Sequence, residues 1–444
     1  MQHNLPQSTR GTAVNLLIEG PDYFNYYIQL IDGAQTSIHL QTYIFEMDEF
    51  GSHVHAALIR AAQRGVQVCV LIDNIGSRNF SALDEESLRQ NSVMFQRFNV
   101  FTYKGLLRVG RRLHHKLLLV DAQHGLVGGI NVTNSNYKHV PQSPHQLDFA
   151  VDLQGPVVIE LTRYGQSLFK KSFGKKLQLA KIPQVVAQTR LSDVVLRISI
   201  NDWVYRRWQI AQTYSKLINQ AQSEITIVNA YFFPRAKFKK QLVAAAKRGV
   251  KVRLILPRIS DWPSYILASE YLYAYFLKRN VEIYQWKNSV LHGKMATVDG
   301  HFATVGSFNL NYTSYQQNLE MNIDVLSTPV TAEWDRVLNN LIETGCEKIN
   351  WDNFSKNSTF RIKCLRFMFY ILLSIVANMS VTLTYQEDNN KNKFYSLIRL
   401  CGAAVFFLLG VIGAILPIMP GTPFFIISFF LIYRQILFIK NIRM

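Results

Sequence analysis

The chain has 444 residues, 48% of them hydrophobic, which is enough for two or three domains with sizeable cores. Its 48 lysines and arginines outnumber 30 aspartates and glutamates, and a formal net charge of +18 favours contact with nucleic acid or an anionic lipid surface. The cysteines stand alone at Cys69, Cys346, Cys364 and Cys401, which excludes a zinc spacing and favours a reducing, cytosolic setting. The residues after Met1 lack the cationic start and apolar run of a signal peptide.

The chain then repeats itself once. Residues 27–34 (YIQLIDGA) match residues 214–221 (YSKLINQA), and an alternating apolar run and an aromatic segment follow each of them. An alanine-rich helix comes next, ending in Arg-Gly-Val at Arg64 and again at Arg248, and it leads into a buried strand. This order predicts two α/β halves with largely parallel sheets, arranged as a pseudo-dimer.

A polar constellation lies late in each copy, with the spacing H-x-K-x4-D-x6-G-[GS]-x-N and no gap in either. The first copy comprises His114, Lys116, Asp121, Gly129 and Asn131. The second comprises His292, Lys294, Asp299, Ser307 and Asn309. A single His-x-Lys on a strand is usually a surface pair, but two copies with identical spacing inside a repeat indicate a site.

The strand that follows each histidine explains the spacing. Residues two apart on a strand share a face, so the imidazole and the ammonium group line one wall of a cleft. The glycine turn allows the backbone to approach an anion, and the asparagine amide can donate to a phosphate oxygen. We expect no metal, because no further histidine or cysteine recurs in both copies and each lysine would repel a cation.

These residues resemble the phospholipase D superfamily, whose signature is this doubled His-Lys-Asp motif. The resemblance covers residues 16–325, and within the superfamily it is similar to the bacterial cardiolipin synthases. The pointers are Gln41–Phe45 with Asp48, Tyr231–Pro234 and Asn318–Glu320. The resemblance implies two tandem phospholipase D-like α/β sandwich halves that face each other, with both motifs in one cleft.

The resemblance also implies roles for the site residues. His114 would attack phosphorus and His292 would act as general acid and base, although the sequence supports the reverse assignment equally. The charge on the phosphate would be stabilised by Lys116, Lys294, Asn131 and Asn309, with Gly129 and Ser307 in the adjoining turns. An acidic residue after each motif would orient the histidine of that motif, namely Asp148 and Glu320. The motif also includes Asp121 and Asp299 in the catalytic set, but we interpret them as structural anchors.

A phosphohistidine intermediate conserves the free energy of the ester, so no cofactor is required. The expected reaction converts two phosphatidylglycerols into cardiolipin and glycerol at a membrane. A phospholipase D-type lipid hydrolase is the first alternative, because only the acceptor differs. A nuclease and a non-catalytic membrane scaffold are further alternatives. The aromatic segments and the membrane tail count against nucleic acid as a partner, and the oligomeric state stays open.

The sequence of the C-terminal region predicts membrane helices. Residues 367–386 carry no charge and follow a basic cluster, which favours a first span with the catalytic part on the cytoplasmic side of a bacterial inner membrane. Residues 400–433 are also uncharged, and central prolines predict two helices there. This segment resembles a small uncharacterised family of bacterial inner-membrane proteins.

The expected division of the chain is a first half over residues 1–165, a basic linker over 166–208, a second half over 209–350 and a membrane region over 351–444. Residues 163–181 around the first boundary mix lysines with phenylalanines. They predict either a helix that touches a lipid leaflet or a solvated basic face.

Overall fold

The computed structural model describes residues 13–99, 111–134, 146–173, 177–182, 194–385, 402–403 and 428–433. The chain divides into two compact units, Met1–Ser358 and Thr359–Met444. Both copies of the repeat lie in the first unit, so the two halves share one compact body.

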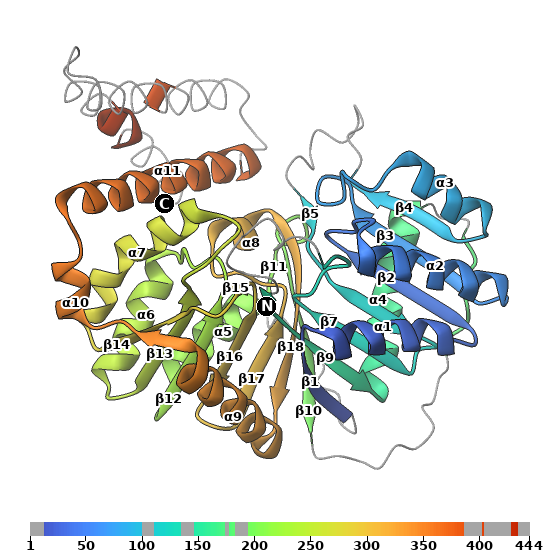
Figure 1. Ribbon diagram of the computed structural model, residues 1–444, viewed down its shortest axis with the longest axis horizontal. Coiled ribbons are helices and arrows are strands. Elements are labelled where there is room, and N and C mark those ends of the chain that lie inside the picture. Colours follow the sequence, from blue (N-terminus) through green and yellow to red (C-terminus); the bar gives the residue numbers. More distant parts are fainter. Residues whose placement is uncertain are drawn as a thin grey trace. The chain divides into compact units, whose positions relative to one another are not determined.

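The first half is built on a seven-stranded sheet with the order β1-β9-β7-β6-β2-β3-β4 (Figure 1). Its strands are β1 (Ala13–Ile18), β2 (Ser37–Thr42), β3 (Gln67–Asp73), β4 (Met94–Phe98), β6 (Leu117–Val120), β7 (His124–Gly128) and β9 (Phe149–Gln154). Its helices are α1 (Pro21–Gly33), α2 (Glu49–Gln63), α3 (Ala82–Gln90) and α4 (Pro156–Phe173).

The second half repeats this order as β10-β18-β17-β16-β12-β13-β14, with β11 and β19 added at the edges. Its strands are β10 (Val195–Asp202), β11 (Arg207–Trp208), β12 (Glu224–Asn229), β13 (Lys251–Pro257), β14 (Val281–Trp286), β16 (Lys294–Val298), β17 (Phe302–Gly306), β18 (Asn318–Leu326) and β19 (Cys346–Lys348). Its helices are α5 (Gln209–Gln220), α6 (Ala236–Lys247), α7 (Pro263–Leu277), α8 (Tyr312–Gln316), α9 (Thr328–Gly345) and α10 (Trp351–Lys356). The predicted pair of repeated α/β halves is therefore confirmed.

The expectation of largely parallel sheets was wrong. Within the two repeated sheet orders, only β2, β3 and β4, and their counterparts β12, β13 and β14, pair in parallel. The other neighbours in the two repeated sheet orders are antiparallel. Parallel pairs need a long crossover such as α2 or α6, whereas the short turn after each motif strand can only reverse the chain.

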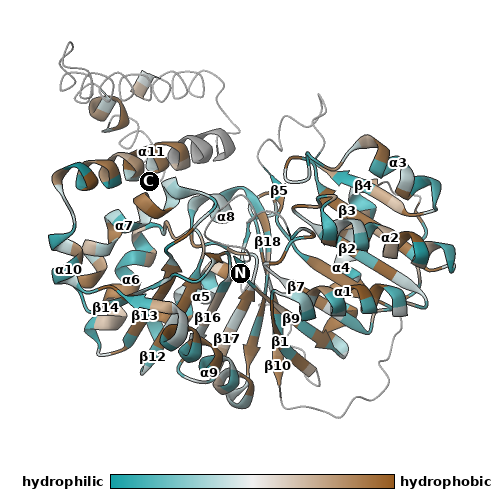
Figure 2. Cartoon of the chain, viewed as in Figure 1, coloured by the Kyte–Doolittle hydropathy of each residue, from teal (hydrophilic) through white to brown (hydrophobic). Residues whose placement is uncertain are grey.

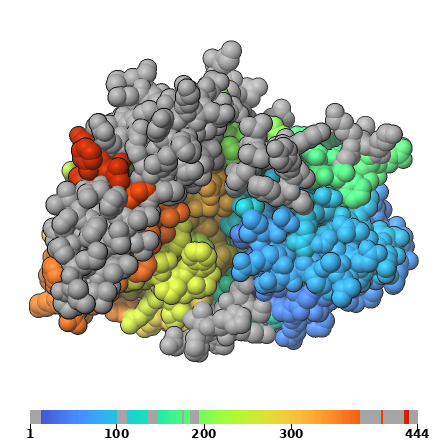
Figure 3. Space-filling view, turned by 90° about the horizontal axis from the view of Figure 1, so that it is seen from above, coloured from blue at the N-terminus to red at the C-terminus, as the bar shows by residue number. Residues whose placement is uncertain are grey.

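Two short strand pairs join the halves directly. Strand β5 (Arg112–Leu113) pairs with β18, and β8 (Gln146–Leu147) pairs with β15 (Val290–Leu291). One core cluster also contains buried residues of both halves, such as Leu119 and Phe149 with Met295. The blue residues of the first half and the yellow residues of the second half lie next to one another in Figure 3. Burial of apolar surface thus holds the two motifs at one seam.

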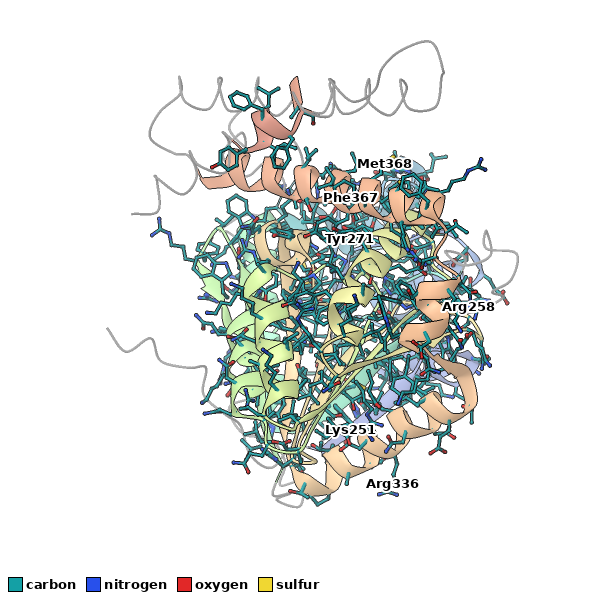
Figure 4. All side chains as sticks on the ribbon, turned by 90° about the vertical axis from the view of Figure 1, so that its left-hand side faces the viewer. Lys251, Arg258, Tyr271, Arg336, Phe367 and Met368 are labelled. Atoms are coloured by element: carbon teal, nitrogen blue, oxygen red, sulfur yellow. The ribbon has the colours of Figure 1, made fainter. Side chains whose placement is uncertain are left out.

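The helices of both halves carry apolar and polar residues, which appear as mixed brown and teal in Figure 2. This is the pattern of helices with one face on a sheet and the other in water. Exposed cations lie on the outer side of the second half, where Figure 4 labels Lys251, Arg258 and Arg336. Part of the basic charge is therefore a solvated surface.

The expected linker over residues 166–208 needs correction. Helix α4 continues across its first boundary to Phe173, and β10 is an integral strand of the second sheet. The apolar face of α4, including Leu168 and Phe169, is buried in the shared core. That face is covered by protein, so this part of the predicted leaflet-touching helix is wrong.

The second unit contains α11 (Phe360–Tyr385), which carries Arg361, Lys363 and Arg366 in its first turns. Within the ranges that the structure describes, no helix is long and apolar enough to cross a membrane. The first span predicted at residues 367–386 is therefore not confirmed. Nearly all of the predicted pair of helices over residues 400–433 lies outside the described residues.

The seam gives a prediction at Gly293, the middle residue of the second His-x-Lys. A Cβ added there would lie 2.5 Å from the ring of Phe149, which belongs to the first half. We expect Gly293→Ala to lower the free energy of unfolding by about 1–3 kcal/mol through overpacking. Thermal unfolding would measure this loss. Gly33→Ala is the control, because nothing lies within 4 Å of its added Cβ, and equal melting temperatures of the two variants would contradict the prediction.

Candidate active site

His114 follows β5 and is held by the opposite half. Its backbone N–H donates to the Leu319 carbonyl at 3.0 Å, and its Nδ1 lies 2.8 Å from Oε2 of Glu320 on β18. The side chain of Glu320 is completely buried and that of His114 is 11% exposed. A carboxylate on Nδ1 fixes the tautomer with the proton on that atom. The lone pair of Nε2 is then available for reaction.

His292 has the mirrored arrangement. Its N–H donates to the Leu147 carbonyl at 2.9 Å, and its Nδ1 lies 2.6 Å from Oδ2 of Asp148. Asp148 lies between β8 and β9 of the first half. The expectation that each acid orients the histidine of its own motif was therefore wrong: Asp148 binds His292 and Glu320 binds His114. The short strand pairs across the seam bring each acid to the other copy.

The motif lysines are buried beside their histidines. The Lys116 ammonium group donates to the His114 carbonyl at 3.0 Å, and that of Lys294 donates to the His292 carbonyl. Lys294 also lies 3.8 Å from Oδ2 of Asp148. Each lysine is thus anchored next to its histidine, although His114 and His292 precede the motif strands instead of lying on them.

Burial and neighbouring charges set the protonation of the site. Burial, outweighing the attraction of Glu320, lowers the pKa of His114 to about 4, and burial also lowers the pKa of His292. Burial lowers the pKa of Lys116 to about 7. For Asp148 and Glu320 burial acts in the raising direction, but the facing lysines and imidazoles hold each pKa below its ordinary value. Both imidazoles are therefore neutral at pH 7 and face ionised carboxylates.

The four turn residues predicted for the phosphate divide into two kinds. Gly129 and Ser307 support the acids: a Cβ on Gly129 would lie 2.2 Å from the Asp148 carboxylate, and the Ser307 hydroxyl donates to Glu320. Asn131 and Asn309 are both buried. The Asn131 Oδ1 accepts from the Ile44 N–H at 3.2 Å, whereas no partner is described for the Asn309 Oδ1. The phosphate-binding role of these asparagines stays a prediction.

The motif aspartates lie at the other end of the motif strands, about 13 Å away along four residues. The Asp121 carboxylate accepts from the backbone N–H groups of Gln35, Thr36 and Ser37. Asp299 does the same for the equivalent residues before β12, at 2.8–2.9 Å. Both aspartates have positive φ in a tight turn, which Asp tolerates better than most residues. This geometry corrects their place in the catalytic set and favours the anchor interpretation.

Several residues at the site were missed by the sequence reasoning. The rings of Tyr43 and Tyr231 lie beside His114 and His292, with centroids 4.9 and 5.9 Å from the imidazoles. Both tyrosines belong to the aromatic segments of the repeat. Their matching positions before the two motifs are the sequence signal that could have identified them.

Glu19 was also missed, and it makes the two sides of the site unequal. Its N–H donates to the Asp148 carbonyl at 3.0 Å, and its Oε2 accepts from Gln146 at 2.6 Å. Burial and the charge of Asp148 raise the pKa of Glu19 well above its ordinary value. The register places Asn201 opposite Glu320 at the equivalent position. At this position the first half therefore has a carboxyl group where the second half has an amide.

In the described part of the chain, no group of three or more His, Cys, Asp or Glu side chains could hold a metal ion. The cations already in place are the two buried lysines. Ammonium groups of this kind bind anions such as a phosphodiester.

The comparisons with known proteins agree with this geometry. A family described as cardiolipin synthase, phospholipase D-like domain, matches residues 27–144 and 214–342, one match in each half. Cardiolipin synthase B of Shigella flexneri is 31% identical over 363 residues, covering 78% of this chain and 86% of that protein. The chain belongs to the cardiolipin synthase family with phospholipase D-like domains. The resemblance predicted from the doubled motif is confirmed.

Another curated relative and one solved structure also match this member of the cardiolipin synthase family. The major cardiolipin synthase ClsA of Bacillus subtilis is 30% identical over 317 residues, covering 71% of this chain and 65% of that protein. The crystal structure of phosphatidylserine synthase from Haemophilus influenzae matches with a TM-score of 0.65 and 14% identity, covering 84% of this chain and 96% of that one. At that identity the match shows the fold alone.

The anchor role gives a prediction for Asp121→Asn. The amide cannot accept all the backbone N–H groups that the carboxylate accepts, so we expect the free energy of unfolding to fall by about 1–3 kcal/mol. Denaturant unfolding would measure it, with Asp32→Asn as control, because the Asp32–Arg60 pair is exposed. A variant of unchanged stability whose folded protein is inactive would contradict the anchor role.

Proposed function

We propose that this chain is a cardiolipin synthase that joins two phosphatidylglycerol molecules and releases glycerol. The observation that carries the proposal is the pair of buried imidazoles, each beside a lysine and each bonded to a carboxylate of the opposite half. Membership of the cardiolipin synthase family supports the substrate class.

The first step transfers the phosphatidyl group to the protein. The free Nε2 of His114 attacks phosphorus, an N–P bond forms and the P–O bond to the head-group glycerol breaks. His292 supplies the proton that the departing alkoxide takes. The negative charge of the substrate phosphate raises the pKa of His292 in the complex, so that this imidazole can hold a proton.

The second step returns the phosphatidyl group to an alcohol. The terminal hydroxyl of a second phosphatidylglycerol gives its proton to His292 and attacks phosphorus, and the N–P bond to His114 breaks. Lys116 and Lys294 stabilise the charge on the non-bridging oxygens in both steps. One phosphodiester is broken and one is formed in the complete cycle, so the reaction needs no cofactor.

The proposed substrate is a membrane lipid, which requires contact with a lipid surface. We propose that the uncharged segment at residues 400–433 provides this contact, at the cytoplasmic face of a bacterial inner membrane. The sequence supports this proposal through the length and apolar character of the segment. The basic charge of the chain adds attraction to anionic lipid.

Substitution of either histidine tests the shared site. We expect His114→Ala and His292→Ala each to reduce cardiolipin formation by about a thousand-fold or more, because the two imidazoles act as one unit. Phosphatidylglycerol in detergent or vesicles is the substrate, and the products are resolved by mass. His53→Ala, which removes an exposed histidine from α2, is the matched control and should retain full activity.

The outcomes of this assay separate the candidate functions. Cardiolipin with glycerol supports the proposal, and phosphatidic acid alone would replace it with lipid hydrolysis. Cleavage of DNA without lipid turnover would replace it with a nuclease, and no turnover of either would favour a scaffold. A phosphatidyl group trapped on His292 instead of His114 would reverse their roles. Substantial activity in either single variant would overturn the shared site.

The protonation of the site gives a prediction for pH. Since the pKa of His114 is lowered to about 4, its nucleophilic form persists until the pH falls to that value. Since the pKa of Lys116 is lowered to about 7, its positive charge is lost as the pH rises through 7. We expect kcat/KM to decline above about pH 7 and to show its acidic limb near 4, with folding monitored by circular dichroism. An acidic limb centred at 6.5 would contradict the burial of His114.

A further inference from the structure

A second cationic site lies at the junction of the two halves, in a cavity of about 650 Å³. None of the described residues that line it belongs to the two motifs. The lining includes charged side chains from both halves: Arg97, Arg111, Arg163, Lys171, Asp202 and Arg207. Five of these six are cations, so the hollow is strongly positive before any ligand is considered.

Two of the cations are already neutralised by protein. Arg111 is buried and forms an ion pair with Asp202 at 2.5 Å, and its guanidinium lies between the rings of Phe98 and Tyr205 at 5.2 and 5.3 Å. Arg97 pairs with Glu85. These contacts hold the floor of the cavity in a fixed arrangement.

The other three cations have side chains that are exposed to solvent. Among the described residues, the side chains of Arg163, Lys171 and Arg207 have no ion pair or hydrogen bond; Lys171 lies 5.3 Å from the ring centroid of Tyr205. Arg163 and Lys171 come from α4, and Arg207 comes from β11 of the other half. Like charges gathered around a hollow repel one another unless an anion enters. Guanidinium groups match phosphate oxygens with paired hydrogen bonds.

The lining of the cavity adjoins the segment that carries His114, because Arg111 belongs to both. Arg111 directly precedes β5, and that strand leads to His114. Side chains alternate along an extended chain, so Arg111 and His115 lie on one side while Arg112 and His114 lie on the other. An anion at Arg163 and Arg207 would bridge the halves behind the strand that carries His114.

We propose that this junction cavity binds a phosphate-bearing anion, held by Arg163, Lys171 and Arg207, and that binding stabilises the packing of the two halves. The ligand is either a soluble phosphate ester or the phosphate of a lipid head group, since both present the same oxygens. The proposal does not depend on the histidine chemistry, because none of its residues belongs to the motifs.

The test uses the full chain and the double variant Arg163→Ala/Arg207→Ala. Diphosphate and glycerol 3-phosphate are the soluble probes, followed by calorimetry and by the shift in melting temperature. We expect saturable binding that weakens about tenfold or more in the double variant, with the ligand-induced rise in melting temperature lost. The double variant Arg163→Lys/Arg207→Lys keeps the positive charges but removes the paired N–H donors of the guanidinium groups. It should bind with intermediate affinity.

The matched control is Lys237→Ala/Lys240→Ala, which removes two charges from another hollow, on α6. This variant should bind the probes as the wild type does. Equal weakening in the control would show that net charge alone attracts the anion, and binding unchanged in the arginine variant would assign it to the histidine cleft. Either result overturns the proposal.

A lipid arm identifies the source of the phosphate. Sedimentation with vesicles of phosphatidylcholine, with and without phosphatidylglycerol, is compared for the wild type and the two double variants. Loss of phosphatidylglycerol-dependent binding only in the arginine variant assigns a head group, whereas an effect on the soluble probes alone assigns a soluble ester. No saturable binding of the wild type to soluble or vesicle probes would sink the proposal.

Discussion

The exchange of carboxylates across the seam is the constraint on which the site depends. Glu320 and Asp148 are completely buried, and burial of a charge is tolerated only where a partner compensates it. Each accepts a hydrogen bond from the imidazole of the other half, and the buried lysine beside that imidazole supplies the opposite charge. The surrounding sequence follows from this need: Gly129 leaves room for one carboxylate, and the Ser307 hydroxyl donates to the other. The short strand pairs β5–β18 and β8–β15 bring the backbone close enough for both bonds.

Much of this arrangement could be predicted from the sequence, because the repeat and the spacing are local properties. The proximity of each histidine to its lysine was predicted from their spacing of two residues, and Asp121 was interpreted as a structural anchor. The partner of each acid could not be predicted, because Asp148 follows the first motif in the chain and only tertiary structure sends it to His292. The strand directions were predicted wrongly for a similar reason. The Arg-Gly-Val segments mark the ends of the helices that connect parallel strands. The tight turns at the motif aspartates, which connect antiparallel strands, have no comparable sequence pattern.

The basic charge of the chain does several separate things. Lys116 and Lys294 are withdrawn from water and lie beside their imidazoles, where burial weakens their hold on a proton. The cations on the outer side of the second half are solvated and contribute little to stability. At the junction cavity, Arg97 and Arg111 pair with acids, whereas Arg163 and Arg207 are exposed and have no acidic partner among the described residues. A single net charge of +18 conceals these differences.

The swapped acids have a consequence for the origin of the fold. Two identical copies related by a two-fold axis would exchange equivalent side chains, as any isologous interface does. The contacts between the two halves are those that would remain if the gene of such a homodimer were duplicated and fused. Fusion then frees each copy to drift alone, and the difference between Glu19 and Asn201 at equivalent positions is what such drift produces. Duplication and fusion of one domain thus explain both the symmetric exchange of the acids and the asymmetry between Glu19 and Asn201.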